Sequence, residues 1–217
     1  DLCPIHNRRD EISFYDPLIF QKRFDHEKLA YGYRLHYGKM ERDVKTSFPR
    51  LYSYLKRFMK GCPDAFFEIG RRCSQPPYQI NVKPQTRMNL ACEMARFSVL
   101  AAPTNYHRHD MVETFMLTSD LATIACEVPV WYWDKTIDEG ITGHIDILQI
   151  RNGLVYILDF KPDAKRKSMA AGQLFHYARA LSFRTRIPLT SIRCAWFDEH
   201  QYFEFSPHKY VGGMEQG

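Results

Sequence analysis

Two aspartates and a lysine in the second half of the chain are the residues best suited to do chemistry. Asp146 lies in one apolar run, Asp159 lies in the next, and Lys161 follows two residues later. Paired carboxylates bind hard divalent cations such as Mg²⁺. A lysine beside such an ion can orient or deprotonate an attacking water and stabilise charge on a phosphate. These residue types therefore indicate metal-assisted hydrolysis of a phosphate ester.

The aspartates meet only if their two strands pair, and a turn signal predicts that pairing. Asn152 and Gly153 separate the apolar runs 143–150 and 154–161. Asn-Gly between such runs favours a two-residue β-hairpin turn. The resulting register sets the two aspartates directly opposite each other. Opposed carboxylates repel unless a cation or a shared proton lies between them, and the neighbouring lysine favours the cation.

A helix expected over residues 107–119 offers a histidine ligand. His109 and Glu113 are four residues apart and project from the same side of a helix. Mn²⁺ accepts imidazole as well as oxygen ligands. His107 is an alternative ligand, and the spacing to Glu113 favours His109.

The elements that must position these residues follow from apolar spacing and turn signals. Thr86 is expected to cap the second helix, and Met111, Phe115 and Met116 are expected to form the buried stripe of the third. The sequence predicts helices over 50–59, 86–101, 107–119 and 168–184, and strands over 123–133, 143–150, 154–161, 191–197 and 201–205.

This order predicts an α/β fold with a mixed central β-sheet flanked by helices. Residues 86–217 would form the core, and residues 1–85 a largely helical or irregular extension. The stretch 61–84, rich in Cys, Pro and Gly, is interpreted as a loop or linker.

Composition limits the class of protein. The chain has 217 residues, 45% of them hydrophobic, and a net charge of +5, which is compatible with a polyanionic partner. No apolar run is long enough to span a membrane, and no signal-peptide pattern opens the chain, so an intracellular location in the cytoplasm, nucleoid or nucleus is expected. Cys3, His6, Cys62 and Cys73 could hold zinc, but their spacing matches no standard zinc pattern.

The ordered motifs resemble a known family. Gly143-x-x-Asp146, Asp159-x-Lys161 and Gln173-x-x-x-Tyr177 follow a helix that carries His109, and together they resemble the PD-(D/E)XK nuclease superfamily, in particular its RecB-like branch. That branch includes CRISPR-associated and helicase-linked exonucleases. The resemblance covers about residues 86–205 and implies a restriction-endonuclease-like core.

The resemblance also implies roles for individual residues. His109, Asp146 and Asp159 would bind Mg²⁺ or Mn²⁺ together with the backbone carbonyl of Phe160. Lys161 would be the catalytic lysine. Gln173 and Tyr177 would position the substrate strand or the lysine, although they could instead pack one helix face against the sheet.

Two further comparisons with the branch are informative. Glu127 matches a glutamate that is common there, and a structural role is favoured for it over a catalytic one. Several RecB-like nucleases hold an iron–sulfur cluster through one cysteine before the core and three after it. Cys194 is the only cysteine after Cys126 here, so no iron–sulfur cluster is expected.

Basic and aromatic residues could contact nucleic acid. Arg108 and the run Lys165, Arg166 and Lys167 are candidates for phosphate contacts, although such a run is also typical of a solvated loop. The aromatic run 131–133 could stack on unpaired bases, but core packing is favoured for at least two of its three residues.

The function expected from these features is that of a metal-dependent deoxyribonuclease, acting as an exonuclease on single strands or DNA ends. A helicase or recombination protein is a possible partner, and no membrane is involved. The alternatives are a metal-dependent RNA endonuclease of the same superfamily and a catalytically inactive nucleic-acid-binding module.

Overall fold

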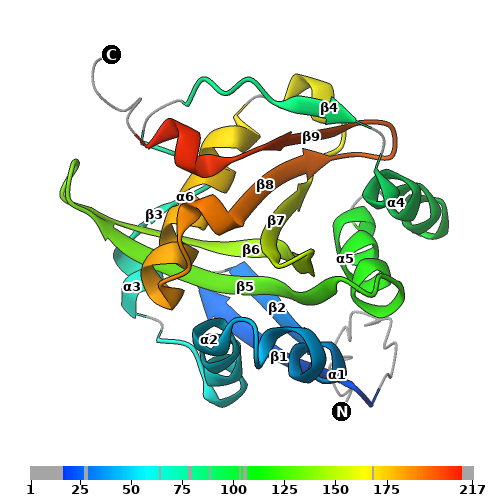
Figure 1. The fold of residues 1–217 in the computed structure, drawn as a ribbon, viewed down its shortest axis with the longest axis horizontal. Coiled ribbons are helices and arrows are strands. Elements are labelled where there is room, and N and C mark those ends of the chain that lie inside the picture. Colours follow the sequence, from blue (N-terminus) through cyan, green and yellow to red (C-terminus); the bar gives the residue numbers. More distant parts are fainter. Residues whose placement is uncertain are drawn as a thin grey trace, which may run out of the picture.

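One mixed β-sheet with helices packed on both of its faces forms the fold (Figure 1). The computed structural model describes residues 17–26, 29–63, 65–77, 80–87, 89–102, 104, 107–167 and 169–211. The expected α/β class with a mixed central sheet is thereby confirmed.

Nine strands of the described chain make up the sheet, in the spatial order β1-β2-β5-β6-β7-β8-β9-β4, with β3 paired to β6 beside this path. Neighbouring strands are antiparallel except β7–β8 and β3–β6, which are parallel. Their bounds are Ile19–His26 (β1), Leu29–His36 (β2), Arg71–Arg72 (β3), Gln85–Arg87 (β4), Thr123–Asp134 (β5), Glu139–Arg151 (β6), Leu154–Phe160 (β7), Ile192–Phe197 (β8) and Tyr202–Phe205 (β9).

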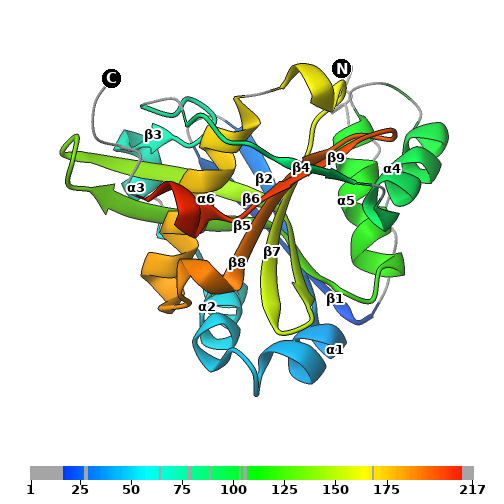
Figure 2. The ribbon, with the colours of Figure 1, turned by 45° about the horizontal axis from the view of Figure 1, so that its top comes forward.

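The helices connect distant strands or cover the sheet. At one side of the molecule the β5–β6 hairpin extends beyond the helices (Figure 2). The helices are α1 (Tyr37–Lys39), which continues into a π-helical turn at Met40–Val44, α2 (Pro49–Lys60), α3 (Ala65–Ile69), α4 (Leu90–Ala101), α5 (Arg108–Ser119) and α6 (Ala170–Thr185), with short 3₁₀ turns at Ala164–Arg166, Leu189–Ser191 and Pro207–Tyr210.

Two hydrophobic clusters lie on opposite faces of the sheet. Helices α2, α3 and α6 pack on one face, and α4 and α5 pack on the other. Strand β7 shows the alternation that a strand between two cores requires, since Ile157 belongs to the first cluster and Leu158 to the second. The long apolar runs of β6 and β7 therefore reflect a sheet that is buried on both sides.

The helix expected over 86–101 begins later than predicted. Asn89, not Thr86, caps α4, and its side chain accepts a hydrogen bond from the Ala91 amide at 2.9 Å. Thr86 instead pairs with Phe203 in the β4–β9 ladder. A strand of three residues is too short to show a periodic pattern in the sequence. It is recognised only from its pairing with the distant strand β9.

The expectation of a largely helical N-terminal extension is also wrong. Strands β1 and β2 form a regular antiparallel pair, and β2 joins the main sheet where Arg34 and Leu35 pair with Cys126 and Ala125. Helix α2 confirms the predicted helix over 50–59, and Leu51, Leu55 and Phe58 are buried. Part of the N-terminal region is thus integral to the sheet.

The buried stripe of α5 differs from the predicted one. Val112, Met116 and Leu117 are fully buried, whereas Met111 and Phe115 are only partly buried. At 100° per residue, Val112, Met116 and Leu117 lie on the same side of the helix as His109 and Glu113, and this side faces the sheet. Met111 and Phe115 lie toward the other side. In α6, Leu174, Ala178 and Leu181 are buried on one side of the helix.

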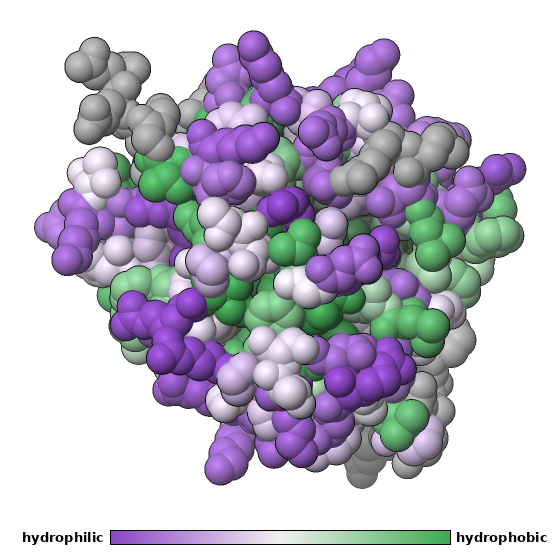
Figure 3. Space-filling model, in the orientation of Figure 1, coloured by the Kyte–Doolittle hydropathy of each residue, from purple (hydrophilic) through white to green (hydrophobic). Residues whose placement is uncertain are grey.

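The surface in the view of Figure 1 is mostly hydrophilic at its border, and hydrophobic side chains gather near the middle (Figure 3). Within the described ranges, no helix combines the length and apolar character that crossing a bilayer requires.

Candidate metal centre

The β6–β7 hairpin has the predicted register. Arg151 pairs with Leu154 and Ile147 pairs with Leu158. The turn residues Asn152 and Gly153 both have positive φ angles, 50° and 72°, as a type I′ turn requires. Asp146 and Asp159 are the residues next to the Ile147–Leu158 pair, on the side away from the turn. The register that the turn sets therefore brings the two acids together.

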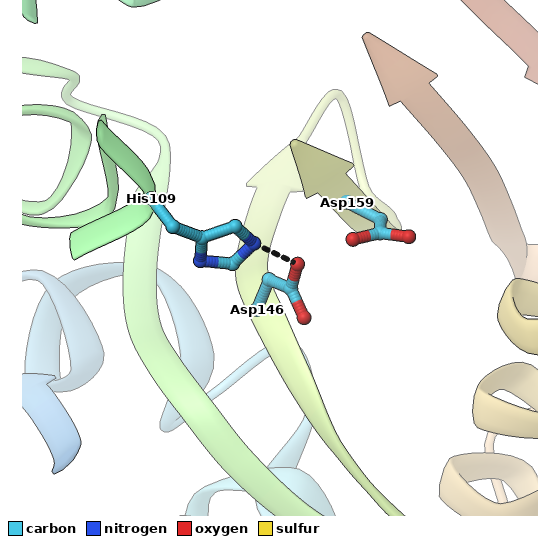
Figure 4. Close-up of side chains that lie close together, drawn as sticks. All are labelled: His109, Asp146 and Asp159. Atoms are coloured by element: carbon cyan, nitrogen blue, oxygen red, sulfur yellow. Dashed lines mark ion pairs between the residues drawn. The ribbon is translucent and has the colours of Figure 1, made fainter. Parts of the chain in front are cut away.

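Three potential ligands meet at this point. One donor atom each from His109, Asp146 and Asp159 lies within 4.8 Å of the others. His109 approaches from α5, with its Nε2 atom 2.9 Å from Asp146 Oδ2 (Figure 4). Lys161 Nζ lies 2.8 Å from Asp159 Oδ1. Four of the residues that the sequence singled out for metal binding and catalysis therefore form one cluster.

His109 is held from behind by a carboxylate. Its Nδ1 atom lies 2.8 Å from Glu113 Oε1, one helical turn away. Glu113 is buried and also bonds to the guanidinium of Arg34, which in turn pairs with Asp110 at 2.7 Å. A carboxylate behind an imidazole fixes its orientation and directs the other nitrogen toward the cluster. His107, the alternative ligand, instead bonds Thr104 Oγ1 at 2.7 Å through its Nδ1 atom.

The two aspartates are too buried and too close to be ionised together without a cation. Burial and the charge of Asp146 raise the pKa of Asp159 well above its usual value. The pKa of Asp146 is lowered, because His109 and hydrogen bonding outweigh the cost of burial. Without a metal ion the pair thus shares a proton that resides on Asp159.

The cationic groups of the cluster are correspondingly stabilised. Burial disfavours the charged form of His109, but Asp146 and Glu113 outweigh it and raise its pKa to about 12. Burial likewise disfavours charge on Lys161, and Asp159 outweighs it, so that the pKa of this ammonium is raised. These two cations offset the negative charge of Asp146 and Glu113.

Glu127 lines the same pocket as Lys161, and the structural role favoured for it from the sequence stays a prediction. Its carboxylate also forms a possible ligand group with His109 and Glu113. Burial and the charge of Glu113 raise its pKa well above the ordinary value. The family resemblance indicated this position, and periodicity did not.

The backbone explains how Glu127 reaches the pocket. Its φ angle is 51°, a left-handed conformation that is unusual for a non-glycine residue. In a regular strand Cys126 and Val128 would face the same side, but they belong to the two opposite hydrophobic clusters. The alternation of side chains along β5 is therefore interrupted at Glu127. This residue lies next to Asp146 on β6.

Gln173 and Tyr177 line the same pocket from α6. Gln173 Nε2 donates a hydrogen bond to the Tyr177 hydroxyl at 2.7 Å. Gly143 permits this close packing, since a Cβ atom there would lie 2.5 Å from Tyr177 Cε1 and 3.1 Å from Cys73 Sγ. The motif residues at 143, 173 and 177 are thus brought together by close approach of α6 to β6.

The pocket has a volume of about 170 Å³. This space is large enough for an ion with its water ligands or for a group of similar size. Its walls come from both parts of the chain, since His26, Tyr31, Phe67 and Arg72 line it together with the residues of the cluster. No motif or spacing in residues 1–85 indicated this N-terminal contribution.

Several predicted contact residues lie outside this pocket. Lys165, Arg166 and Lys167 are exposed on the 3₁₀ turn after Lys161, where Arg166 pairs with Asp163 at 3.4 Å, and Arg108 is partly buried at the start of α5. Their proposed phosphate contacts stay predictions.

The remaining expectations have mixed outcomes. Trp131 and Tyr132 are buried and Trp133 is half exposed, which confirms core packing for two of the three aromatic residues. Phe160 packs its ring edge-on against His109, and the ligand role of its carbonyl stays a prediction. The zinc hypothesis lies outside the described residues, which do not include Cys3 and His6.

Comparisons of this chain with models of protein families, with curated proteins and with solved structures give no match.

Proposed function

We propose that the protein is a metal-dependent nuclease that hydrolyses phosphodiester bonds of DNA. The observation that carries the proposal is the single cluster formed by His109, Asp146 and Asp159, with Lys161 against it. The proposal also draws on the motif resemblance to RecB-like nucleases, which suggests a restriction-endonuclease-like core and action on single strands or DNA ends. A metal-dependent ribonuclease is the alternative that the same cluster supports.

The donor set suits Mg²⁺ or Mn²⁺. Asp159 is buried against Asp146, and a shared proton keeps the pair from full ionisation. A divalent cation can replace that proton and interact with both carboxylates. Two carboxylates with one imidazole fit Mn²⁺, and the carboxylates with water ligands fit Mg²⁺. When bound, such an ion supplies Lewis-acid polarisation of a phosphate oxygen and lowers the pKa of water.

The cluster is a better metal site than the neighbouring group of His109, Glu113 and Glu127. Glu113 already bonds Arg34 and the Nδ1 side of His109. It therefore acts as an orienting group for the histidine. The ligands proposed are Asp146, Asp159 and the Nε2 atom of His109.

Lys161 is proposed to act as a cation in catalysis. Because its pKa is raised, the ammonium keeps its proton at neutral pH. It then donates hydrogen bonds to a phosphate oxygen and to the attacking water, and it stabilises the negative charge that develops on the phosphate. Asp159 holds the ammonium in place at 2.8 Å.

Gln173 and Tyr177 are proposed to position groups in the pocket. Their mutual hydrogen bond fixes the Tyr177 hydroxyl beside the cluster. Burial raises the pKa of Tyr177 well above its ordinary value, so the hydroxyl remains a neutral donor. It is thereby suited to hold a substrate oxygen without adding charge.

A cleavage assay tests this function. The full chain is incubated with Mg²⁺ or Mn²⁺ and end-labelled single-stranded DNA, duplex DNA and RNA. We expect cleavage of DNA, and a rate at least about 100-fold lower for Lys161→Met, the smaller end of the range for a lost catalytic group. Lys135→Met, at an exposed position outside the pocket, is the control and should retain the rate.

Two results would contradict the proposal. One is an absence of cleavage of both nucleic acids with both metals. The other is a Lys161→Met variant that cleaves as fast as the Lys135→Met control. Cleavage confined to RNA would favour the alternative.

A further inference from the structure

The pocket is also lined by rings and by an arginine that the proposed hydrolysis does not use. Tyr31 comes from β2, Phe67 from α3, Arg72 from β3 and His26 from β1. All four belong to the N-terminal region, for which the sequence indicated no role. We name these four residues the N-terminal wall.

The rings of the wall form a rigid stack with His144 of β6. The ring centroids of Tyr31 and His144 are 3.6 Å apart at an interplanar angle of 9°, and those of His26 and Phe67 are 4.0 Å apart at 13°. A hydrogen bond of 2.9 Å between His26 Nδ1 and His144 Nε2 joins the two pairs. Tyr31 is half-buried while the others are buried, so it is the ring that offers surface to the pocket.

Arg72 is held at the pocket by backbone pairing. It lies opposite Thr142 in the parallel β3–β6 ladder, and the Cys73 amide donates to the Thr142 carbonyl at 2.7 Å. Gly70 permits this approach, because a Cβ atom there would clash with Thr142 and with the Phe66 carbonyl. The neighbouring Arg71 lies outside the pocket and pairs with Glu139 at 2.5 Å.

We infer that the N-terminal wall binds one unpaired nucleobase of the substrate beside the scissile phosphate, with Tyr31 as the stacking surface and Arg72 as the cationic contact. The inference rests on the proposed function for the identity of the substrate. Aromatic faces stack on any base, and an arginine adds cation–π and phosphate contacts.

An unpaired base suits this position and a stacked base pair does not. A base within a duplex is covered on both faces by its neighbours, so it offers no face to Tyr31. The wall would therefore select single strands, frayed ends or extruded nucleotides.

Binding and turnover of labelled oligonucleotides test the inference separately. Affinity for a 12-nucleotide single strand and for the matching duplex is measured by fluorescence anisotropy in the Lys161→Met background. The values of kcat and KM are measured in the background of native Lys161. We expect Tyr31→Ala to weaken single-strand binding about five- to 100-fold, the range for loss of one base stack. The same change should raise KM with kcat largely retained.

Matched variants separate stacking from a structural role. Tyr31→Trp should restore single-strand affinity, because it replaces one stacking surface with another, whereas Tyr31→Leu should not. Arg72→Ala should weaken binding, whereas Arg71→Ala on the same strand should leave it unchanged. Tyr37→Ala, at an exposed tyrosine outside the pocket, should also behave as the wild type.

The outcomes distinguish the inference from the function on which it rests. If the protein cleaves DNA but Tyr31→Ala and Arg72→Ala bind single strands like their controls, the inference is wrong and the proposed function stands. If the protein cleaves nothing but single-strand binding falls selectively in these variants, the wall is a binding surface and the proposed function is wrong.

Discussion

At the scale of individual residues, the burial of two neighbouring acids sets the charge state of the cluster. Asp159 is fully buried next to Asp146, and its raised pKa means that the folded protein disfavours its ionised form. A folded-state pKa above the unfolded value stabilises the protein at low pH, and this contribution is lost as the pH rises toward the folded-state pKa. Near neutral pH the pair is therefore poised to exchange a proton for a metal ion.

Metal affinity should depend on pH. Asp159 and His109 have raised pKa values, so both hold protons that a metal ion must displace. We expect Mn²⁺ binding to tighten between about pH 6 and pH 9, by up to about tenfold per pH unit for each proton released. Isothermal titration calorimetry in buffers of different ionisation enthalpy counts the protons.

A histidine pair provides the control for this measurement. The variant His109→Ala should release one proton fewer and bind Mn²⁺ more weakly, while His107→Ala should behave as the wild type. An affinity that does not vary with pH would show that the cluster does not hold the ion.

At the scale of elements, close packing between helix and strand shapes the pocket. Strand β6 supplies Asp146 and passes under α6 at Gly143, where no side chain fits. Strand β5 reverses its buried face at Glu127 through a left-handed backbone. Such a conformation costs on the order of 1–3 kcal/mol and persists where surrounding structure imposes it. The positions of Tyr177 and Glu127 are thus set by the contacts between elements.

Gly143→Ala should destabilise the fold. The added Cβ atom would lie 2.5 Å from Tyr177 Cε1, and the buried tyrosine ring has little room to move. We expect a loss of about 1–3 kcal/mol in the free energy of unfolding, the usual cost of overpacking. Urea denaturation followed by circular dichroism measures it.

Gly32→Ala is the matched control, because Gly32 also lies in a strand and a Cβ atom there would meet nothing within 4 Å. Its effect should stay within about 0.5 kcal/mol. Equal stability of the two variants would show that α6 packs less closely on β6 than the structure describes.

On the scale of the whole molecule, the N-terminal and C-terminal parts share one sheet and one pocket. Strands β1 and β2 extend the sheet beyond β5, and the segment Ala65–Arg72 packs along β6 through β3. Elements from both parts line the pocket. A metal ion bound there should therefore raise the free energy of unfolding of the whole sheet.

The melting temperature should report this coupling. At about 100 times its Kd, a metal ion that binds only the folded state adds about 2.7 kcal/mol of stability. For a chain of this size each kcal/mol raises Tm by roughly 2–4 °C. Differential scanning calorimetry with and without Mn²⁺ should show this rise in the wild type and in Asp138→Asn, an exposed acid outside the pocket, but not in Asp159→Asn. An equal rise in all three would place the ion elsewhere.

The sequence alone determined the hairpin and, through it, the core of the candidate site. Turn chemistry at Asn152 and Gly153 is local, so the register that joins Asp146 to Asp159 follows from neighbouring residues. Helical spacing is equally local, and it correctly favoured His109 over His107 as the residue beside the aspartates.

Only the tertiary structure decided the rest of the pocket. The β4–β9 ladder joins residues more than 100 positions apart, and Cys126 and Val128 on either side of Glu127 pack on opposite faces of the sheet. The N-terminal wall is assembled from β1, β2, α3 and β3. Such contacts depend on long-range packing, which leaves no periodic trace in the segments that make it. The pairing of Asp146 with Asp159 could be predicted because the two residues are close in sequence. The N-terminal wall could not be predicted, because its residues are far in sequence from the cluster that they contact.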